Sequence, residues 1–215
     1  MRTLSRRSLI TGASATAAAA ALAGCTTTST PDASGTSGWQ MAKPGQYRPS
    51  YPNYQRAEVR YLTQEPPGTI IIDPPTHYLF LVEAGGKARR YGIGVGGEGY
   101  GWSGEATVNS KQEWPDWYPT PEILQRQPQL NARLSKLQSG QGVPGGPENP
   151  LGARALYLWH DHKDTLYRIH GTNEPWSIGQ NVSSGCIRMV NDDVIDLYNR
   201  ASVGTKVVVL PARAI

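Results

Sequence analysis

Two residues toward the C-terminal end of the chain, His170 and Cys186, could together carry out nucleophilic chemistry. A cysteine attacks as its thiolate, so it needs a neighbour that accepts its proton or stabilises its charge. Histidine does either near neutral pH, provided that an acceptor at its other ring nitrogen fixes the tautomer. His170 ends the segment TLYRIH, and Gly171 lets the backbone turn and offer a carbonyl oxygen to the imidazole. The alternative is a hydrogen-bonded core histidine and an inert buried thiol.

The segment SSGCIRM, residues 183–189, could complete such a site. Gly185 permits a tight bend, after which the amides of Gly185 and Cys186 could converge on one oxygen and form an oxyanion hole. If CIR is extended, Cys186 and Arg188 project on one side while Ile187 faces the core. Arg188 would then raise the thiolate fraction and could hold a substrate carboxylate.

The N-terminal segment predicts export. Residues 1–24 join three arginines to a short alanine-rich run, as in a signal peptide, and the run is too short for a stable membrane span. SRRSLIT resembles a twin-arginine signal with Leu9 in place of phenylalanine, and LAGC resembles a lipobox that makes Cys25 a lipidation site. The alternative is an ordinary secretory signal with an incidental cysteine. Thr26 favours the outer over the inner membrane, so we expect a lipid-anchored periplasmic protein.

Charge and cysteine content narrow the function further. Loss of residues 1–24 would lower the formal net charge from +4 to +1, because that segment holds three arginines and no acid. No basic stripe follows, which gives no support to a nucleic-acid partner. The chain has two cysteines, so lipidation of Cys25 leaves Cys186 unpaired. Exported proteins tend to pair their cysteines or to lack them, so a lone thiol suggests a chemical role.

The chain divides into an export signal (1–24), a lipid anchor with a Ser-, Thr-, Pro- and Gly-rich linker (25–57), and one domain (58–211). The domain pattern is mainly β with one or two short helices. Strands are expected at 69–73, 77–84 and 87–96 as a meander, at 155–160 and 165–171 as a hairpin around DHKD, and at 206–211. Helices are expected at 191–201, capped by Asn191 or Asp192, and at 120–124, with Thr120 as cap and Pro121 as first residue.

The pattern of residues 96–152 predicts a loop-rich region, which contains Trp102, Trp114 and Trp117. Long loops on a β scaffold often build a binding site. The alternative is an apolar cluster that covers one sheet.

HGT at 170–172, a gap, and SSGCIRM followed by NDDVIDLY together resemble the signature of the L,D-transpeptidase family, also called the YkuD-type domain. Residues 102–123 and 149–158 resemble its periplasmic members, and the likeness covers about residues 58–211. The resemblance implies a β-sandwich with one or two short helices and long loops. It also implies that Cys186 is the nucleophile, His170 the proton donor and acceptor, Gly171 the residue whose carbonyl orients His170, and Gly185 and Cys186 the oxyanion amides.

The substrate contacts expected from this resemblance are Arg188, Ser183, Ser184 and Trp176. Ser184 stands where many members have a histidine, which puts the surroundings of the site in doubt rather than the mechanism. The implied reaction is acyl transfer in peptidoglycan. Cys186 attacks the peptide bond that follows the third residue of a tetrapeptide stem, and D-alanine leaves. The amine of a second stem then forms a 3→3 cross-link. Water as acceptor would make an L,D-carboxypeptidase, and a protein amine would attach an envelope protein to the wall. The resemblance implies no cofactor.

Two rival functions belong to other classes. A zinc hydrolase could use His160, His162 and Asp164 of HDHKD, although a polar hairpin turn explains the same residues. A non-catalytic lipoprotein could instead grip the wall through its tryptophans.

Several further residues have a mainly structural interpretation. His77, next to a Pro-Pro turn, is expected to be structural, and Asp192 and Asp193 are expected to be helix-start acids. Trp176 and Ser177 either line the acceptor side or pin the loop between base and nucleophile.

Overall fold

The computed structural model describes residues 54–97, 101–183 and 185–211, all within a compact unit that spans Gln40–Ile215. The predicted signal, Cys25, most of the linker and Ser184 lie outside the described residues. Contacts begin ahead of the predicted boundary at residue 58, because the ring of Tyr54 meets His77 edge-on and Arg56 pairs with Asp193. No helix in the described part of the chain is long and apolar enough to cross a bilayer.

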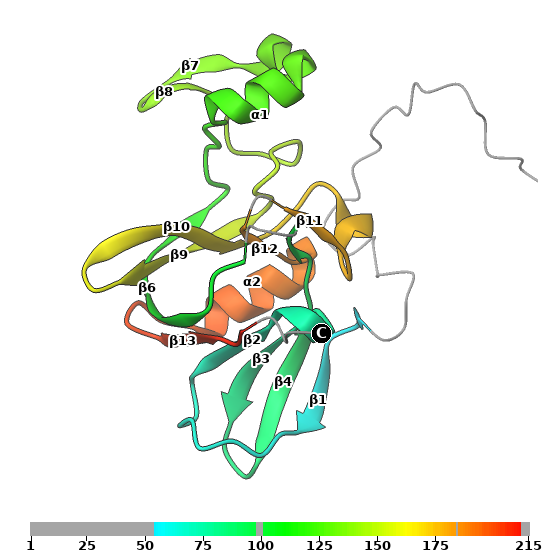
Figure 1. The fold of residues 1–215 in the computed structure, drawn as a ribbon, viewed down its shortest axis with the longest axis vertical. Helices are drawn as coiled ribbons and strands as arrows, with labels where there is room; N and C mark the ends of the chain where they lie inside the picture. The colour runs from blue at the N-terminus through cyan, green and yellow to red at the C-terminus, as the bar shows by residue number, and fades with distance from the viewer. Residues whose placement is uncertain (1–53, 98–100, 184, 212–215) are drawn as a thin grey trace, which may run out of the picture. The chain divides into compact units, whose positions relative to one another are not determined.

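Nine strands form one hydrogen-bonded sheet in the order β1-β4-β3-β2-β13-β6-β9-β10-β12 (Figure 1). Most neighbours are antiparallel, whereas β2 with β13 and β10 with β12 are parallel. The strands are β1 (Ala57–Arg60), β2 (Ile70–Asp73), β3 (Tyr78–Glu83), β4 (Lys87–Gly92), β6 (Gly104–Glu113), β9 (Arg154–His160), β10 (Lys163–His170), β12 (Ile187–Arg188) and β13 (Lys206–Val209). Two small sheets pair β5 (Val95–Gly96) with β11 (Asn181–Ser183) and β7 (Ser135–Leu137) with β8 (Gly140–Gly142).

The predicted meander and hairpin are confirmed as β2-β3-β4 and β9-β10. The loop-rich interpretation of 96–152 is wrong for β6, a ten-residue strand between β13 and β9. Its sequence, GEATVNSKQE, conceals the strand because only Ala106 and Val108 are buried and the rest is polar. Partner strands that are distant in the sequence, rather than local β propensity, therefore fix this segment.

The helices are α1 (Pro121–Arg126) and α2 (Asn191–Arg200), with 3-10 turns at Pro74–Thr76, Pro128–Arg133 and Pro175–Ser177. Thr120 caps α1 as predicted, since its hydroxyl accepts a hydrogen bond from the Ile123 amide at 3.4 Å. The predicted cap of α2 is wrong. Val190 occupies the N-cap without a side-chain hydrogen bond, and Asn191 instead accepts a hydrogen bond from the Ala153 amide at 2.9 Å.

Helix α2 lies between the β1–β4 half of the sheet and the β6–β9–β10 half, as Figure 1 shows. Lys111 of β6 donates to the carbonyls of Tyr198 and Ala201, both at 2.6 Å. Tyr91 of β4 donates to Asp196 of the same helix at 2.7 Å. The two halves of one sheet thus enclose a shared core, which confirms the predicted mainly β sandwich class.

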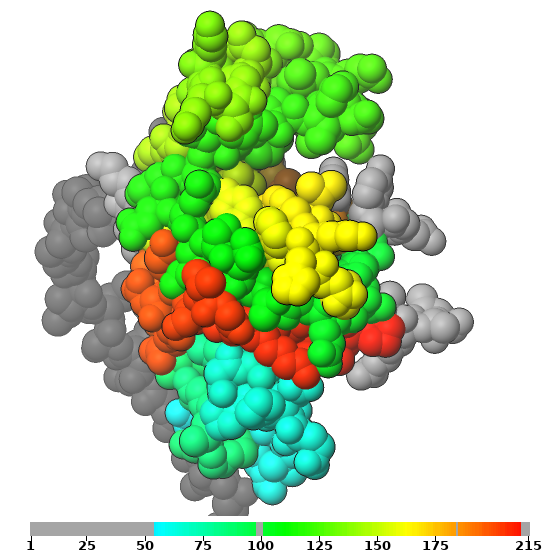
Figure 2. All heavy atoms as spheres, turned by 90° about the vertical axis from the view of Figure 1, so that its left-hand side faces the viewer, coloured from blue at the N-terminus to red at the C-terminus, as the bar shows by residue number. Residues whose placement is uncertain are grey.

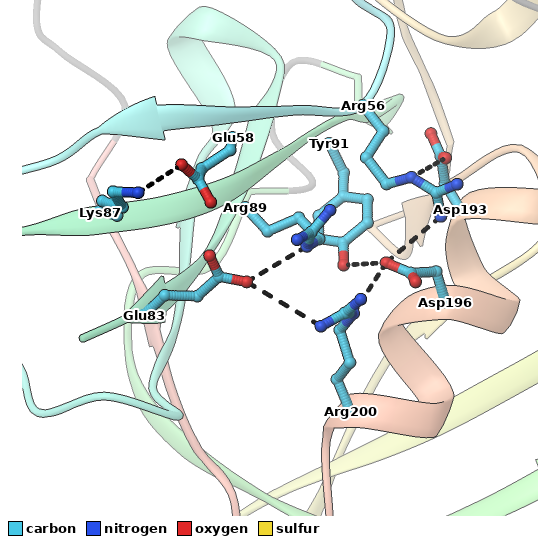
Figure 3. Close-up of polar contacts among 9 residues, drawn as sticks. All are labelled: Arg56, Glu58, Glu83, Lys87, Arg89, Tyr91, Asp193, Asp196 and Arg200. Carbon is cyan, nitrogen blue, oxygen red and sulfur yellow. Dashed lines mark hydrogen bonds and ion pairs between the residues drawn. The ribbon is translucent and has the colours of Figure 1, made fainter. Parts of the chain in front are cut away.

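An ionic network joins α2 to the start of the domain (Figure 3). Arg56 contacts Asp193 at 3.8 Å and Asp196 at 3.2 Å. Arg200 bonds Asp196 at 3.1 Å and reaches Glu83 of β3 at 4.0 Å. The segment before β1 is therefore fastened to the helix that follows the nucleophile segment.

Candidate active site

Adjacent parallel strands position the two candidate catalytic residues, His170 and Cys186. The pairing of β10 with β12 matches Ile169 with Ile187 and His170 with Arg188. Cys186 immediately precedes β12, so it lies beside β10 at about the level of Arg168. His170 and Cys186, sixteen residues apart in sequence, come from neighbouring strands because this parallel pair folds the intervening loop back.

His170 is buried, with 4% of its surface exposed. Its Nδ1 is 2.5 Å from the Gly171 oxygen. A carbonyl only accepts hydrogen bonds, so Nδ1 carries the proton and Nε2 keeps its lone pair. Burial above all, and then the charge of Arg188, lower the pKa of His170 to about 3 despite the opposing effect of the Gly171 hydrogen bond. His170 is therefore a neutral imidazole at physiological pH, in the tautomer that a general base needs.

Asn191 holds the backbone that orients His170, although sequence reasoning had assigned it to helix capping. Its Oδ1 accepts the hydrogen bond of the buried Ala153 amide at 2.9 Å. A Cβ on Gly171 would collide with that same oxygen and come within 2.9 Å of the Ala153 nitrogen. Gly171 is thus glycine because Asn191 packs directly against it, and no local sequence pattern signals this contact.

Cys186 is a free, partly exposed thiol. Ile187 and Met189 are buried while Cys186 and Arg188 are partly exposed, which confirms the predicted alternation. The thiol donates to the Leu166 oxygen of β10 over 3.9 Å, rather than to His170. Burial raises the pKa of Cys186, against a backbone hydrogen bond from Arg168 and the charges of Arg168 and Arg188. The sulfur is therefore protonated in the resting site.

Ser183 shapes the turn that carries Cys186. Its hydroxyl, in a buried residue, donates to the Cys186 oxygen at 2.6 Å and accepts from the Gly185 amide at 3.2 Å. Gly185 has a φ of +120°, a conformation that favours glycine. In the free protein the Gly185 amide thus donates to the Ser183 hydroxyl, while the substrate contact expected of Ser183 and the oxyanion contact expected of Gly185 stay predictions.

Glu174, which sequence reasoning missed, pairs with Arg188 at 2.6 Å. Its backbone oxygen accepts a hydrogen bond from the buried Ser177 hydroxyl, also at 2.6 Å. Ser177 therefore pins the loop between base and nucleophile, whereas Trp176 in the same turn is 48% exposed. Arg188 is engaged by the protein itself, and its charge is partly balanced before any substrate arrives.

Two residues of the rival metal site, His160 and Asp164, have other partners. The His160 Nδ1 donates to the Glu105 oxygen at 2.6 Å. Asp164 accepts two hydrogen bonds from Arg168, each of 2.7 Å. Within the described residues, no group of three or more His, Cys, Asp or Glu side chains could hold a metal ion, so the zinc interpretation gains no support.

Two more predictions concern aromatic residues. His77 lies in a left-handed turn just before β3 rather than within a strand, and it donates to Asn181 of β11 at 2.7 Å. That contact agrees with its expected structural role. Trp102 packs against the core and lies 5.7 Å from the Tyr167 ring, which favours the covering role over sugar binding for this tryptophan.

The L,D-transpeptidase catalytic domain, YkuD, matches residues 67–209 of the chain. The chain belongs to this family. The probable L,D-transpeptidase ErfK/SrfK of Escherichia coli is 40% identical over 123 residues, which cover 55% of this chain and 35% of that protein. The putative L,D-transpeptidase YqjB of Bacillus subtilis is 50% identical over 68 residues, which cover 30% of this chain and 38% of that protein. The chain spans only about a third of the length of the curated relatives it matches.

Two solved structures extend the comparison. A Brucella melitensis protein described as a probable carnitine operon oxidoreductase is 49% identical, covers 75% of this chain and 96% of its own, and gives a TM-score of 0.49. An L,D-transpeptidase from Mycobacterium smegmatis is 19% identical, with coverages of 66% and 58% and a TM-score of 0.46. The family expected from the motif is thus confirmed by the match over residues 67–209.

Proposed function

We propose that this protein is a peptidoglycan L,D-transpeptidase that forms 3→3 cross-links through a thioester on Cys186. The observation that carries the proposal is the hydrogen bond from His170 Nδ1 to the Gly171 oxygen, which leaves Nε2 as a base. That base ends the strand beside which Cys186 lies. Family membership supplies the reaction class, and the site supplies a nucleophile and a base in keeping with it.

The first half-reaction acylates the enzyme. A tetrapeptide stem places the carbonyl of its third residue against Cys186. The thiol breaks its hydrogen bond to the Leu166 oxygen and gives its proton to His170 Nε2 as the sulfur attacks. The Cys186 amide donates to the developing oxyanion. When the tetrahedral intermediate collapses, the carbon–nitrogen bond breaks and His170 returns the proton to the departing amine of D-alanine. The product is a thioester on Cys186.

The second half-reaction transfers the acyl group. The amine of the diamino acid in another stem attacks the thioester carbonyl while His170 removes a proton from its nitrogen. The carbon–sulfur bond then breaks, and the proton passes from His170 to the departing thiolate. This sequence forms the 3→3 amide bond and restores the neutral thiol and neutral imidazole.

Arg188 and Trp176 are the substrate contacts that the site supports best. A guanidinium has five N–H donors, so the pair with Glu174 leaves some for a stem carboxylate. The half-exposed Trp176 offers an apolar surface at the edge of the loop between base and nucleophile.

The same acyl-enzyme would serve an L,D-carboxypeptidase if water were the acceptor, or wall attachment of an envelope protein if a protein amine were.

We assign the protein to the periplasm, with a lipid anchor at Cys25 and the outer membrane favoured over the inner. This assignment rests on the pattern of residues 1–26. Cys25→Ser should move the protein from the membrane fraction to the soluble fraction.

The test incubates the full chain carrying Cys25→Ser with purified tetrapeptide muropeptides and follows the products by mass spectrometry. We expect loss of D-alanine and formation of cross-linked dimers, both abolished by Cys186→Ala. Tripeptide products without dimers would name water as the acceptor. D-alanine release that persists in Cys186→Ala would refute the proposed nucleophile. A wild type that leaves all muropeptides unchanged would favour a non-catalytic wall-binding protein.

A further inference from the structure

Strand β10 contains an irregularity close to Cys186. Its pairing with β9 changes register between Asp164 and Arg168, as at a β-bulge. Leu166, in the middle of this bulge, has a φ of +64°. A bulky residue rarely adopts this left-handed conformation, which glycine or asparagine adopts with far less strain. Bulges of this kind often re-aim a side chain next to an active site.

The bulge is held by side chains. The Asp164 carboxylate accepts a hydrogen bond from the Leu166 amide at 2.8 Å and two from the Arg168 guanidinium at 2.7 Å each. The Thr165 hydroxyl accepts a hydrogen bond from the Tyr167 amide at 3.1 Å and donates one to the Leu158 oxygen of β9 at 2.6 Å. These contacts fix the conformation of the backbone on both sides of Leu166.

The side chain of Leu166 is not explained by folding. It is 76% exposed, so it contributes little to the core, and its backbone conformation is unfavourable for leucine. Figure 2 shows the β9–β10 hairpin, in yellow, at the surface beside β6. The Leu166 carbonyl oxygen is nevertheless 3.9 Å from the Cys186 sulfur. An exposed apolar residue therefore has its backbone carbonyl fixed beside the thiol of Cys186.

We propose that Leu166 is a specificity-determining residue for the acyl donor. Its side chain covers the alkyl part of the donor residue whose carbonyl Cys186 attacks, and the contact removes apolar surface of both groups from water. The inference rests on the proposed function, because it presumes that a stem peptide reaches Cys186. It adds a contact from β10, on a different element from Arg188 and Trp176.

The test compares Leu166→Gly, Leu166→Asn and Leu166→Met in the full chain carrying Cys25→Ser. Glycine and asparagine suit a positive φ but remove the apolar side chain, whereas methionine preserves its size. We expect kcat/KM for D-alanine release to fall about tenfold with glycine or asparagine, as suits partial burial of one leucine, and to stay near wild type with methionine. The loss should lie mainly in KM. Iodoacetamide should alkylate Cys186 at an unchanged rate in all three variants.

Leu62→Gly is the matched control, because Leu62 is 75% exposed and lies between β1 and β2. It should leave kcat/KM unchanged. Wild-type kcat/KM in Leu166→Gly would overturn the inference and leave Leu166 with a backbone role only. A Leu166→Gly variant whose alkylation rate falls together with its kcat/KM would also overturn it, since the thiol itself would then be disturbed. A wild type that releases no D-alanine would refute the proposed function and this inference with it.

Discussion

The protonation state of the resting pair gives the most direct test of the site. Burial lowers the pKa of His170 to about 3 and raises the pKa of Cys186 above its ordinary value of 9.0. Between pH 4 and pH 8 the site therefore holds a neutral imidazole and a neutral thiol. A preformed thiolate–imidazolium pair would require the opposite order of the two pKa values.

The two pKa shifts act together, since a lowered pKa of His170 and a raised pKa of Cys186 both oppose transfer of the proton from Sγ to Nε2 in the free enzyme. At about 1.4 kcal/mol per pKa unit, protonating His170 at pH 7 in the free enzyme costs about 5 kcal/mol. About one His170 in ten thousand would then be protonated at pH 7. Proton transfer must accompany attack on the substrate rather than precede it.

The assay is alkylation of Cys186 by iodoacetamide from pH 4 to pH 10, in the chain carrying Cys25→Ser so that one thiol remains. Because only the thiolate reacts, the rate should rise about tenfold per pH unit from pH 5 to pH 8 without a plateau. A plateau in that range would reveal a thiolate stabilised by protonated His170 and would refute the reasoning.

His170→Gln provides the second arm of the same experiment. A neutral imidazole adds no charge, so the alkylation profile should change little. D-alanine release should fall about 10²- to 10⁴-fold because the general base is missing. A marked loss of alkylation at pH 7 in His170→Gln would indicate an ion pair instead.

Three further predictions concern stability. Burial above all raises the pKa of Asp193 from 3.8 to about 6, so the contribution of Asp193 to stability should be greatest below pH 3.8 and be lost as the pH rises through about 6, by up to ~3 kcal/mol. Asp193→Asn should remove most of that decline in urea unfolding at pH 4 and pH 7, and an unchanged decline would contradict the assignment. Asn191→Ala should lower the unfolding free energy by about 1–3 kcal/mol because the Ala153 amide loses its acceptor, and Asn191→Asp should recover most of it. Gly171→Ala should cost about 1–3 kcal/mol through the collision with Asn191, visible as a lower urea midpoint, whereas a wild-type midpoint would mean that the backbone can yield.

The sequence by itself determined the pair and its local geometry. A strand alternates its side chains, so Cys186 and Arg188 had to share a side once Ile187 faced the core. Gly171 after the histidine and Gly185 before the cysteine marked the two bends, and DHKD marked the hairpin turn. The family motif, too, is a matter of residue types at close spacing.

Tertiary structure decided what depends on residues distant in the chain. Strand β6 forms because β13 and β9 flank it, although its own sequence is largely polar. Asn191 became the support of Gly171 rather than a helix cap because Ala153 presents a buried amide to it.

The chemistry of the site depends on the same long-range packing. Burial rather than residue type sets the pKa values of His170 and Cys186, and the bulge that places Leu166 beside the sulfur exists only in the register of β10 with β9. Desolvation and strand register arise only when distant segments meet, and for this reason they could not be read from the order of the residues.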